Sequence, residues 1–128
     1  MDVAIGIVVR NQSQLLALCL DSLNRQTVQP REILIVDNAS SDACGPDGGT
    51  RNIIQRWVTA RGQSSQVQVY HRKQNNLAEA RQHILSITTC KWLMFLDADC
   101  TIEPACLATI QDHWRSLSRE RPTLTAIV

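Results

Sequence analysis

The chain of 128 residues has 44% hydrophobic and 20% charged side chains, a balance that is typical of one compact domain and excludes disordered or low-complexity chains. Thirteen basic and twelve acidic residues give a net charge of +1, so no long-range field favours nucleic acid as a partner. No apolar run approaches the roughly 20 residues of a membrane span, and no signal-like leader precedes the first apolar segment. We therefore expect a cytoplasmic domain, with the inner face of the membrane as an alternative position.

Five cysteines occur at irregular spacing, without a Cys-x-x-Cys pair. Zinc sites and disulfide-rich domains use paired spacings. The pattern therefore predicts free thiols, with neither a disulfide framework nor a zinc site.

Segments with strand and helix patterns alternate along the chain. Residues 3–9, 32–36 and 92–96 are apolar runs of the kind that form strands covered on both faces. Residues 66–71 alternate between polar and apolar side chains, which is typical of an edge strand, and residues 123–128 begin another strand. Apolar spacings of three and four residues predict helices from about 13 to 26, 50 to 60, 77 to 88 and 104 to 117.

This alternation predicts an α/β fold with a mostly parallel central sheet between layers of helices, a Rossmann-like three-layer sandwich. The stretch between Asn38 and Thr50 is rich in glycine, serine and aspartate, so we expect it to be irregular. The final apolar run reaches Val128 without a closing helix. We therefore expect residues 1–128 to be the first part of a longer domain, incomplete at the C-terminus.

Polar residues follow three of the predicted strands, at the edge where open α/β sheets bind small ligands. We expect four carboxylates to meet there. The residues at these strand ends are Arg10 and Asn11, then Asp37, Asn38, Ser40 and Asp42, then Asp97, Ala98, Asp99 and Cys100.

The sharpest local signal is the pair Asp97 and Asp99, which leaves a buried strand. Two carboxylates so close repel each other, and their hard oxygen atoms suit Mg²⁺ or Mn²⁺ carrying a diphosphate. The alternative is a turn in which Asp97 only caps the following segment, and the pair alone does not decide between them.

Three other polar residues, two at strand ends and one in a helix, have both a ligand-binding and a structural interpretation. Asp37 could accept a hydrogen bond from a base N–H or a ribose hydroxyl, or form a plain Asx turn. Asn11 is interpreted first as a helix cap. Arg81, in the middle of a helix, suits a phosphate or carboxylate partner, or a solvated face paired with a neighbouring glutamate. The scattered His71, His83 and His113 form no ligand set or catalytic triad, and a surface or half-buried role is expected for each.

Several common catalytic motifs are absent from the sequence. It contains no GxSxG nucleophile elbow, no GxxxxGK[ST] phosphate loop and no GxGxxG dinucleotide loop. Acyl transfer, P-loop ATPase chemistry and Rossmann dinucleotide binding are therefore unsupported.

Five blocks in order resemble the family 2 glycosyltransferases of GT-A fold: VAIGIVVRN (3–11), CLDSLNRQT (19–27), EILIVDNASSD (32–42), NNLAEARQ (75–82) and KWLMFLDADC (91–100), followed by Glu103-Pro104. They extend over nearly the whole chain. The resemblance implies an enzyme that moves a sugar, with inversion, from a nucleoside-diphosphate donor to an acceptor hydroxyl. A UDP-linked donor, a polysaccharide or glycolipid acceptor and Mn²⁺ or Mg²⁺ are implied with it, and a homo-oligomer stays open.

The resemblance also assigns roles to residues. Asp37 would contact the base, usually uracil, and Asp97 would hold ribose or sugar hydroxyls. Asp99 would ligate the metal on the diphosphate, and Arg81 would support the phosphate side. The substrate-binding set that we expect is Val9, Arg10, Asn11, Asp37, Asn38, Arg81, Asp97 and Ala98, with Asp99 as the metal ligand.

The sequence also departs from the family pattern. Arg10 replaces the usual small aromatic residue, and Cys100 stands where an acid or amide often follows. Asn76 and Ile84 stand where glycine is usual; asparagine tolerates a left-handed backbone, whereas Ile84 cannot replace a close-packed glycine without displacement. In the family the general base follows the nucleotide half, so we expect it beyond Val128. The chain alone should bind donor weakly and transfer little.

Three other functions remain open at this point. The chain could be a non-catalytic module that kept the nucleotide pocket. A nucleotidyltransferase is less favoured because the glycine-rich basic loop after the first strand is absent. A phosphoacceptor receiver domain would need a cluster of acids where Arg10 and Asn11 stand.

Overall fold

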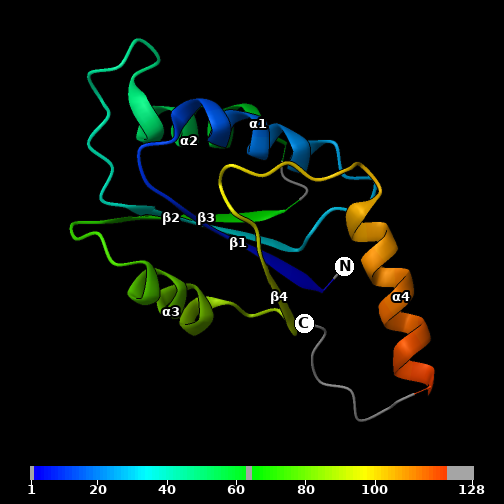
Figure 1. Ribbon diagram of the computed structural model, residues 1–128. Coiled ribbons are helices and arrows are strands. Elements are labelled where there is room, and N and C mark those ends of the chain that lie inside the picture. Colours follow the sequence, from blue (N-terminus) through cyan, green and yellow to red (C-terminus); the bar gives the residue numbers. More distant parts are fainter. Residues whose placement is uncertain (1, 63–64, 121–128) are drawn as a thin grey trace.

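The computed structural model describes residues 2–62 and 65–120. The strand predicted at residues 123–128 lies outside the described residues. Strands and helices alternate as expected (Figure 1). The elements are β1 (Val3–Val9), α1 (Ser13–Asn24), β2 (Glu32–Asn38), α2 (Gly49–Ala60), β3 (Gln66–Arg72), α3 (Leu77–Ile87), β4 (Trp92–Phe95) and α4 (Cys106–Glu120).

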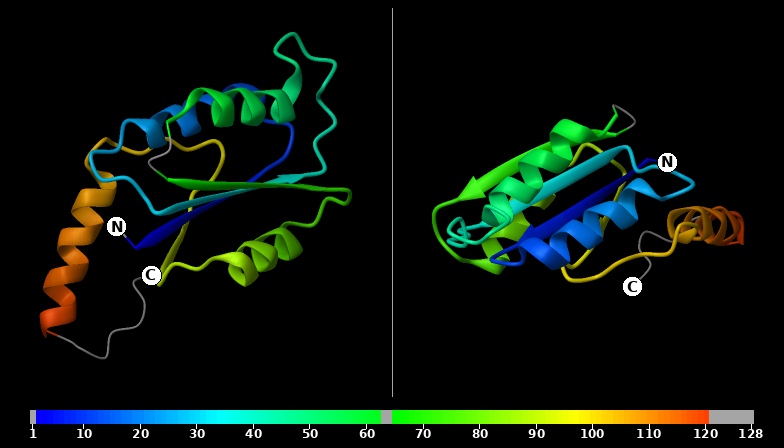
Figure 2. Two further views of the ribbon diagram at one scale, coloured as in Figure 1. Left: turned by 180° about the vertical axis from the view of Figure 1, so that it is seen from behind. Right: turned by 90° about the horizontal axis from the view of Figure 1, so that it is seen from above.

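The four strands of the described residues form one sheet in the order β3-β2-β1-β4, and every neighbouring pair is parallel. Helices α1 and α2 cover one face of the sheet and α3 covers the other (Figures 1 and 2). Helix α4 lies beside the β4 edge, where the rings of Trp114 and Trp92 have centroids 3.9 Å apart. The predicted α/β fold class with its three layers is confirmed.

Side chains of the central strands alternate between the two layers, as the pleat of a strand requires. Ile5 and Ile7 belong to the core beneath α1 and α2. Gly6 faces α3 instead, where a Cβ atom would come within 2.9 Å of Ile84 Cγ2. The bare backbone of Gly6 therefore provides room for Ile84, which is fully buried.

Several element boundaries differ from the sequence-based expectation, and three of them bear on the site. Strand β2 continues through Asp37 and Asn38 because both pair with β3. Helix α4 begins at Cys106 rather than Pro104. Strand β4 ends at Phe95 and is only half-buried, since it is an edge strand of the described sheet.

The amino end of β2 carries a buried carboxylate. Glu32 is 0% exposed and accepts hydrogen bonds from Thr88 Oγ1 and from the backbone N–H and hydroxyl of Thr89. Burial alone would raise the pKa of Glu32, but these hydrogen bonds outweigh it and hold the pKa below its ordinary value of 4.5. The ionised side chain thus ties the segment after α3 to the sheet.

No helix among residues 2–62 and 65–120 has the length and apolar character needed to cross a bilayer. All five cysteines are free thiols.

Candidate functional site

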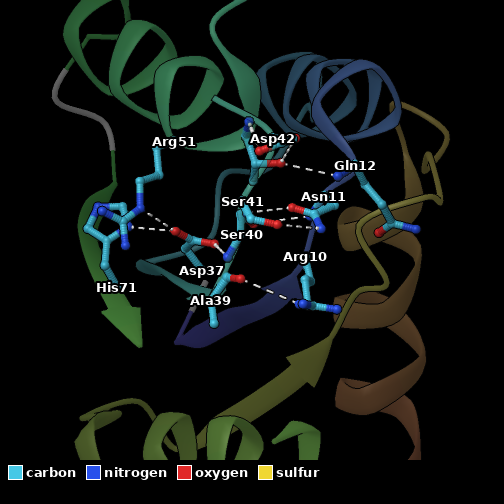
Figure 3. A network of polar contacts seen from close by, with 11 residues as sticks. Arg10, Asn11, Gln12, Asp37, Ala39, Ser40, Ser41, Asp42, Arg51 and His71 are labelled. Carbon is cyan, nitrogen blue, oxygen red and sulfur yellow. Dashed lines mark hydrogen bonds and ion pairs between the residues drawn. The ribbon is translucent and has the colours of Figure 1, made fainter. Parts of the chain in front are cut away.

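The residues expected at the site gather at the carboxyl edge of the sheet. Because β1, β2 and β4 are parallel and β1 lies between the other two, their C-terminal ends share this edge. The loops after β1 and β2 lie side by side there and exchange hydrogen bonds (Figure 3). The loop that carries Asp97 and Asp99 leaves the same edge from β4.

Asp37 is the buried centre of this network. Its side chain is 0% exposed, and it forms hydrogen bonds with three groups (Figure 3). Oδ1 accepts from the backbone N–H of Ser40 at 3.0 Å, while Oδ2 lies 2.8 Å from Arg51 Nε and 3.0 Å from His71 Nδ1. The bond to Ser40 closes a turn three residues long rather than the two-residue Asx turn that was the alternative for Asp37, and the carboxylate also joins α2 to β3.

The surroundings of Asp37 stabilise its ionised form. Burial by itself would raise the pKa of the carboxyl group. The hydrogen bonds from Ser40, His71 and Arg51 outweigh that cost and place the pKa below its ordinary value of 3.8. Asp37 is thus a fixed negative charge at neutral pH, neutralised by an arginine at its side.

Asn11 connects the loops after β1 and β2. Its Oδ1 accepts from the backbone N–H of Ser41 at 2.7 Å, and its own N–H donates to Ser40 Oγ at 3.0 Å. The helix-cap interpretation of Asn11 is wrong, because Gln12 is the N-cap of α1 and Asn11 has a φ of 51°. Ala39 also has a positive φ, 64°, and its carbonyl oxygen accepts from Arg10 Nε at 3.4 Å. Such backbone is costly without support, so the bonds between the loops hold it.

Asn38 uses its amide to fix the start of α3. Nδ2 donates to Asn75 Oδ1 at 2.9 Å, and Oδ1 accepts from the backbone N–H of Asn76 at 3.1 Å. Asn76 then caps α3 by accepting from Glu79 N–H, with an extended φ of −147° rather than the left-handed one. Asn38 therefore positions the helix that carries Arg81.

Asp42 serves the start of α2. It accepts from the backbone N–H and the hydroxyl of Thr50, at 3.0 and 2.7 Å, and that hydroxyl in turn accepts from Gln12 N–H. A Cβ atom on Gly49 would lie 2.5 Å from the carbonyl oxygen of Asp42, and the φ of Gly49 is 78°, so only glycine fits. Asp42 is a structural carboxylate here.

A second group of charges follows β4. One ligand atom each of Asp97, Asp99 and Cys100 lies within 4.8 Å of the others, and all three residues are exposed. Arg81 Nη2 is 3.8 Å from Asp97 Oδ1, a loose ion pair between two exposed side chains. Glu79 pairs with Arg72 rather than with Arg81, so the expected pairing within α3 is not formed.

These acids fit a hard divalent cation. Mg²⁺ and Mn²⁺ prefer carboxylate oxygens and keep open positions for water or phosphate, which exposed side chains allow. Asp97 and Asp99 provide two such carboxylates, with the Cys100 thiol close by. Asp99 and Asp97 are therefore the residues that could hold a metal ion at this edge.

The loop behind Asp99 is fastened to the end of α1. Gln26 Nε2 donates to the carbonyl oxygen of Glu103 at 2.7 Å, and its Oε1 accepts from Leu107 N–H at 3.1 Å. Ser22 Oγ accepts from Ile102 N–H at 3.2 Å. Two buried polar residues, Ser22 in α1 and Gln26 just after it, thus hold the main chain that leads away from the acids.

Two expected substrate-binding residues turn their side chains into the core. Val9 is 1% and Ala98 is 3% exposed, and both belong to the core beneath α1 and α2. Their side chains are therefore not available to a ligand at this edge.

Sequence reasoning missed Arg51 and interpreted His71 only as a surface or half-buried residue. Both lie against Asp37, with side chains 54% and 41% exposed. The signal for His71 was present, because an edge strand parallel to β2 places its last residues beside Asp37. Arg51 carried no such signal, because its contact with Asp37 joins two positions 14 residues apart across the irregular loop before α2.

A groove of about 690 Å³ lies elsewhere, between β4 and α4. Its lining includes Trp92, Met94, Ile110 and Trp114 and none of the acids that follow β4.

Comparison with known proteins gives one family. A family model described as glycosyl transferase family 2 matches residues 4–119. EpsH of Bacillus subtilis (strain 168), which is assigned as a glycosyltransferase, is 28% identical over 102 residues, covering 80% of this chain and 27% of EpsH.

Solved structures show the same fold. The TarS 1-349 structure from S. aureus superposes with a TM-score of 0.72 at 18% identity, over 93% of this chain and 33% of that chain. It has also been solved with UDP and with UDP-GlcNAc. The mannosyltransferase PcManGT from Pyrobaculum calidifontis, in complex with GDP-Man and Mn²⁺, superposes with a TM-score of 0.72 at 23% identity, over 84% of this chain and 30% of that chain.

The chain spans about a third or less of the length of these relatives. The two superpositions show the shared GT-A fold. Since the family model matches most of the chain, this protein belongs to glycosyl transferase family 2.

Proposed function

We propose that this chain is the nucleotide-sugar-binding part of a glycosyltransferase that transfers a sugar from a UDP-linked donor to an acceptor hydroxyl. The single observation that carries the proposal is the shared edge. Asp37, with its arginine and histidine, lies at the end of β2, and Asp97 and Asp99 follow β4 at the same edge. TarS in complex with UDP and PcManGT in complex with GDP-Man and Mn²⁺ support a nucleotide-sugar donor.

The two ends of the carboxyl edge would bind different parts of the donor. The β2 end, with Asp37 and Asn38, would receive the base and ribose. Arg10 and Asn11, with the backbone of Val9, would line the middle. The β4 end would receive the diphosphate and sugar, with Asp97 and the backbone of Ala98 near the sugar, Asp99 on Mn²⁺ or Mg²⁺, and Arg81 near the phosphates.

Transfer would depend on the charge of the leaving group. When bound, a divalent cation supplies positive charge that stabilises the departing diphosphate. Arg81 adds a permanent cation on the same side, 3.8 Å from Asp97. The bonds of Asn38 to residues 75 and 76 hold the start of the helix that carries Arg81.

We further propose that the acceptor site and the general base lie in the part of the relatives that this chain does not cover. A direct displacement with inversion then needs one base near the acceptor hydroxyl. A polysaccharide or glycolipid acceptor at the inner face of the membrane is consistent with the family. The chain alone should bind donor but transfer little.

Thermal unfolding in the presence of UDP tests the site. We expect UDP to raise the Tm of the chain when Mn²⁺ is present and much less when it is absent, because ligand that binds only the folded state stabilises it. Asp99→Asn should remove the Mn²⁺-dependent part. Asp112→Asn, which changes an exposed carboxylate on α4, is the matched control and should keep it.

Two results would count against the proposal. UDP with Mn²⁺ would leave the Tm of the unmodified chain unchanged, or the Asp99→Asn chain would respond as fully as the Asp112→Asn chain. A response that survives in Asp99→Asn would move the metal site away from the β4 end.

A further inference from the structure

We propose that Ser22 and Gln26 are positioning residues for the metal site, because they hold the loop that carries Asp99 in the conformation that binds a divalent cation. The inference rests on the proposed function, since it needs a cation at the β4 end of the carboxyl edge. It adds two buried side chains that would act through the main chain rather than as ligands.

The loop that carries the acids has no regular structure of its own. The described residues 96–105 lie between β4 and α4 and contain neither helix nor strand. Leu96 N–H donates to the carbonyl oxygen of Gly6 at 2.9 Å, which fixes the start of the loop on β1. Cys100 N–H then closes a turn onto the carbonyl oxygen of Asp97 at 3.0 Å. The rest of such a loop stays in one conformation only if groups outside it bind its main chain.

Those groups come from one side of α1 and from the turn that follows it. The hydroxyl oxygen of Ser22 accepts from Ile102 N–H at 3.2 Å. Gln26 donates from Nε2 to the carbonyl oxygen of Glu103 at 2.7 Å, and its Oε1 accepts from Leu107 N–H at 3.1 Å. Figure 1 shows the loop, in yellow, passing beside α1 on its way to α4. Two side chains therefore bind three main-chain groups between the acids and the first turn of α4.

Both side chains are themselves held in one orientation. The Ser22 hydroxyl donates to the carbonyl oxygen of Cys19 at 2.7 Å, and the amide of Gln26 also donates to the carbonyl oxygen of Ser22 at 3.3 Å. A hydroxyl has one hydrogen to donate and an amide nitrogen has two, so these donors are fully used. A buried network that is satisfied in this way specifies one arrangement of the surrounding chain.

The helix beneath the two side chains is a rigid support. Ser22 is 0% and Gln26 is 5% exposed. Helix α1 packs on the sheet through Leu16, Leu20 and Leu23, which are all 0% exposed. The place of the loop is therefore set by the core of the protein and does not depend on the side chains of the loop.

The acids need this support because they repel each other. Carboxylate oxygens of Asp97 and Asp99 lie within 4.8 Å of one another, and both residues are exposed. On a mobile loop such charges would move apart, and a cation would then bring them together at a cost in conformational entropy. A loop that is ordered in advance presents both carboxylates together, so the affinity for the cation is higher. Hydrogen bonds that orient metal ligands have the same effect.

The experiment measures the binding of Mn²⁺ to the whole chain by electron paramagnetic resonance, with and without UDP. The signal of free Mn²⁺ decreases on binding, so the dissociation constant is obtained without any transfer activity. Gln26→Met keeps the size of the side chain but removes both bonds to the loop, and it should weaken Mn²⁺ binding by roughly threefold to tenfold. Ser22→Ala removes one bond to the loop and should have a smaller effect in the same direction.

Gln29→Met is the matched control. The amide of Gln29 donates to carbonyl oxygens at the end of α1, those of Leu23, Asn24 and Gln26, at 2.9 to 3.4 Å. The same substitution there costs stability in the same region but does not release the acid loop, so Mn²⁺ affinity should stay unchanged. Urea denaturation of each variant shows that the affinities are compared between chains of similar stability.

Hydrogen exchange shows whether the loop itself is released, and it needs no metal. The N–H groups of Ile102 and Leu107 donate to the two proposed positioning residues. Exchange at Ile102 should become faster in Ser22→Ala and exchange at Leu107 faster in Gln26→Met, whereas both should stay slow in Gln29→Met. Because each variant releases a different N–H group, either one decides the question if the other fails to fold.

The outcomes distinguish this inference from the proposed function. If the unmodified chain binds no Mn²⁺, or if Asp99→Asn binds it equally well, the proposed function fails and the inference fails with it. If the unmodified chain binds Mn²⁺ through Asp99, only the inference is at stake. It is overturned if Ser22→Ala and Gln26→Met keep full Mn²⁺ affinity, whether or not the loop exchanges faster, or if Gln29→Met loses as much affinity as they do.

Discussion

The two ends of the carboxyl edge are built in opposite ways. At the β2 end, Asp37 is 0% exposed and is bonded to Ser40, Arg51 and His71 at 2.8 to 3.0 Å. At the β4 end, Asp97 is 70% exposed in its side chain, and its partner Arg81 is 3.8 Å away. One end has its charges paired by the protein, and the other leaves its carboxylates open to solvent.

This difference shows which interactions the fold supplies and which it leaves to a ligand. Buried charges must be paired or the structure loses much stability, so the β2 end is complete in itself. Exposed charges contribute little to stability and can therefore be kept for binding. The β4 end is suited to exchange its water for a cation and a diphosphate.

The largest expected effect contrasts the two ends directly. Asp37→Asn should lower the free energy of unfolding by about 2–4 kcal/mol, because it leaves a buried site facing Arg51 and His71 without its charge. Asp99→Asn should change it by less than about 0.5 kcal/mol, as an exposed substitution does. Urea denaturation of the chain without ligand measures both.

A loss in Asp99→Asn that equals the loss in Asp37→Asn would contradict this contrast. The slope of the unfolding free energy against urea should stay the same in both variants, which shows that the unfolded states are comparable.

A smaller loss is expected where α3 packs on the sheet. Gly6→Ala should cost about 1–3 kcal/mol, because the new methyl group would lie 2.9 Å from Ile84 Cγ2. The helix should shift and carry Arg81 with it, so the β4 end changes without any substitution of a charged residue. Urea denaturation measures the cost, and Ile84→Leu in the same chain should recover part of it, because leucine has no Cγ2 methyl group. No recovery would mean that the contact with Ile84 is not the cause.

Acid should weaken the β2 end through Asp37. Its pKa in the folded chain lies below the ordinary 3.8, so its contribution to stability is present above that value and is lost as the pH falls through the lower folded pKa. Glu32, whose pKa is also lowered, adds to the same acid transition from the opposite end of β2. Between about pH 5 and pH 3, the unfolding free energy should fall less steeply in Asp37→Asn than in the unmodified chain. Parallel slopes would show that Asp37 does not contribute.

The smallest effect is a difference in thiol reactivity. Cys19 is 0% exposed, and burial, followed by the nearby charges, raises its pKa to about 12. Cys44 is exposed on the loop before α2. A thiol reagent at neutral pH should modify Cys44 in the folded chain and reach Cys19 only after unfolding, as peptide mass spectrometry would show. Rapid labelling of Cys19 would indicate that the layer beneath the β4 end opens readily.

The layers of the fold could be predicted because strands and helices have different apolar periods. The runs at residues 3–9 and 33–36 have no polar interruption, and both lie in central strands. The run at residues 92–96 looks the same in sequence but lies at the edge of the described sheet. A run of apolar residues predicts that a strand is buried. It does not predict whether a neighbouring strand or a helix such as α4 covers it.

The site was predicted less completely, because a strand end identifies positions but not partners. Asp37, Asp97 and Asp99 lie at the expected edge since each follows a parallel strand. Arg51 was not predicted, because the irregular loop of residues 39–48 lies between it and Asp37. Sequence patterns do not predict the course of such a loop. Asn11 was misjudged for a related reason: its side chain bonds to a loop 30 positions away rather than to its own helix.

The attachment of Gln26 makes the metal end sensitive to a distant position. Its side-chain amide bonds to two main-chain groups, the carbonyl oxygen of Glu103 and the N–H of Leu107. These residues lie 77 and 81 positions further along the chain. Side chains of that loop can therefore be substituted without loss of these hydrogen bonds. A substitution of Gln26 would remove them, and the loop that carries Asp99 would become more mobile. A substitution of Gln26 would therefore lower the affinity for the cation, although Gln26 does not contact it.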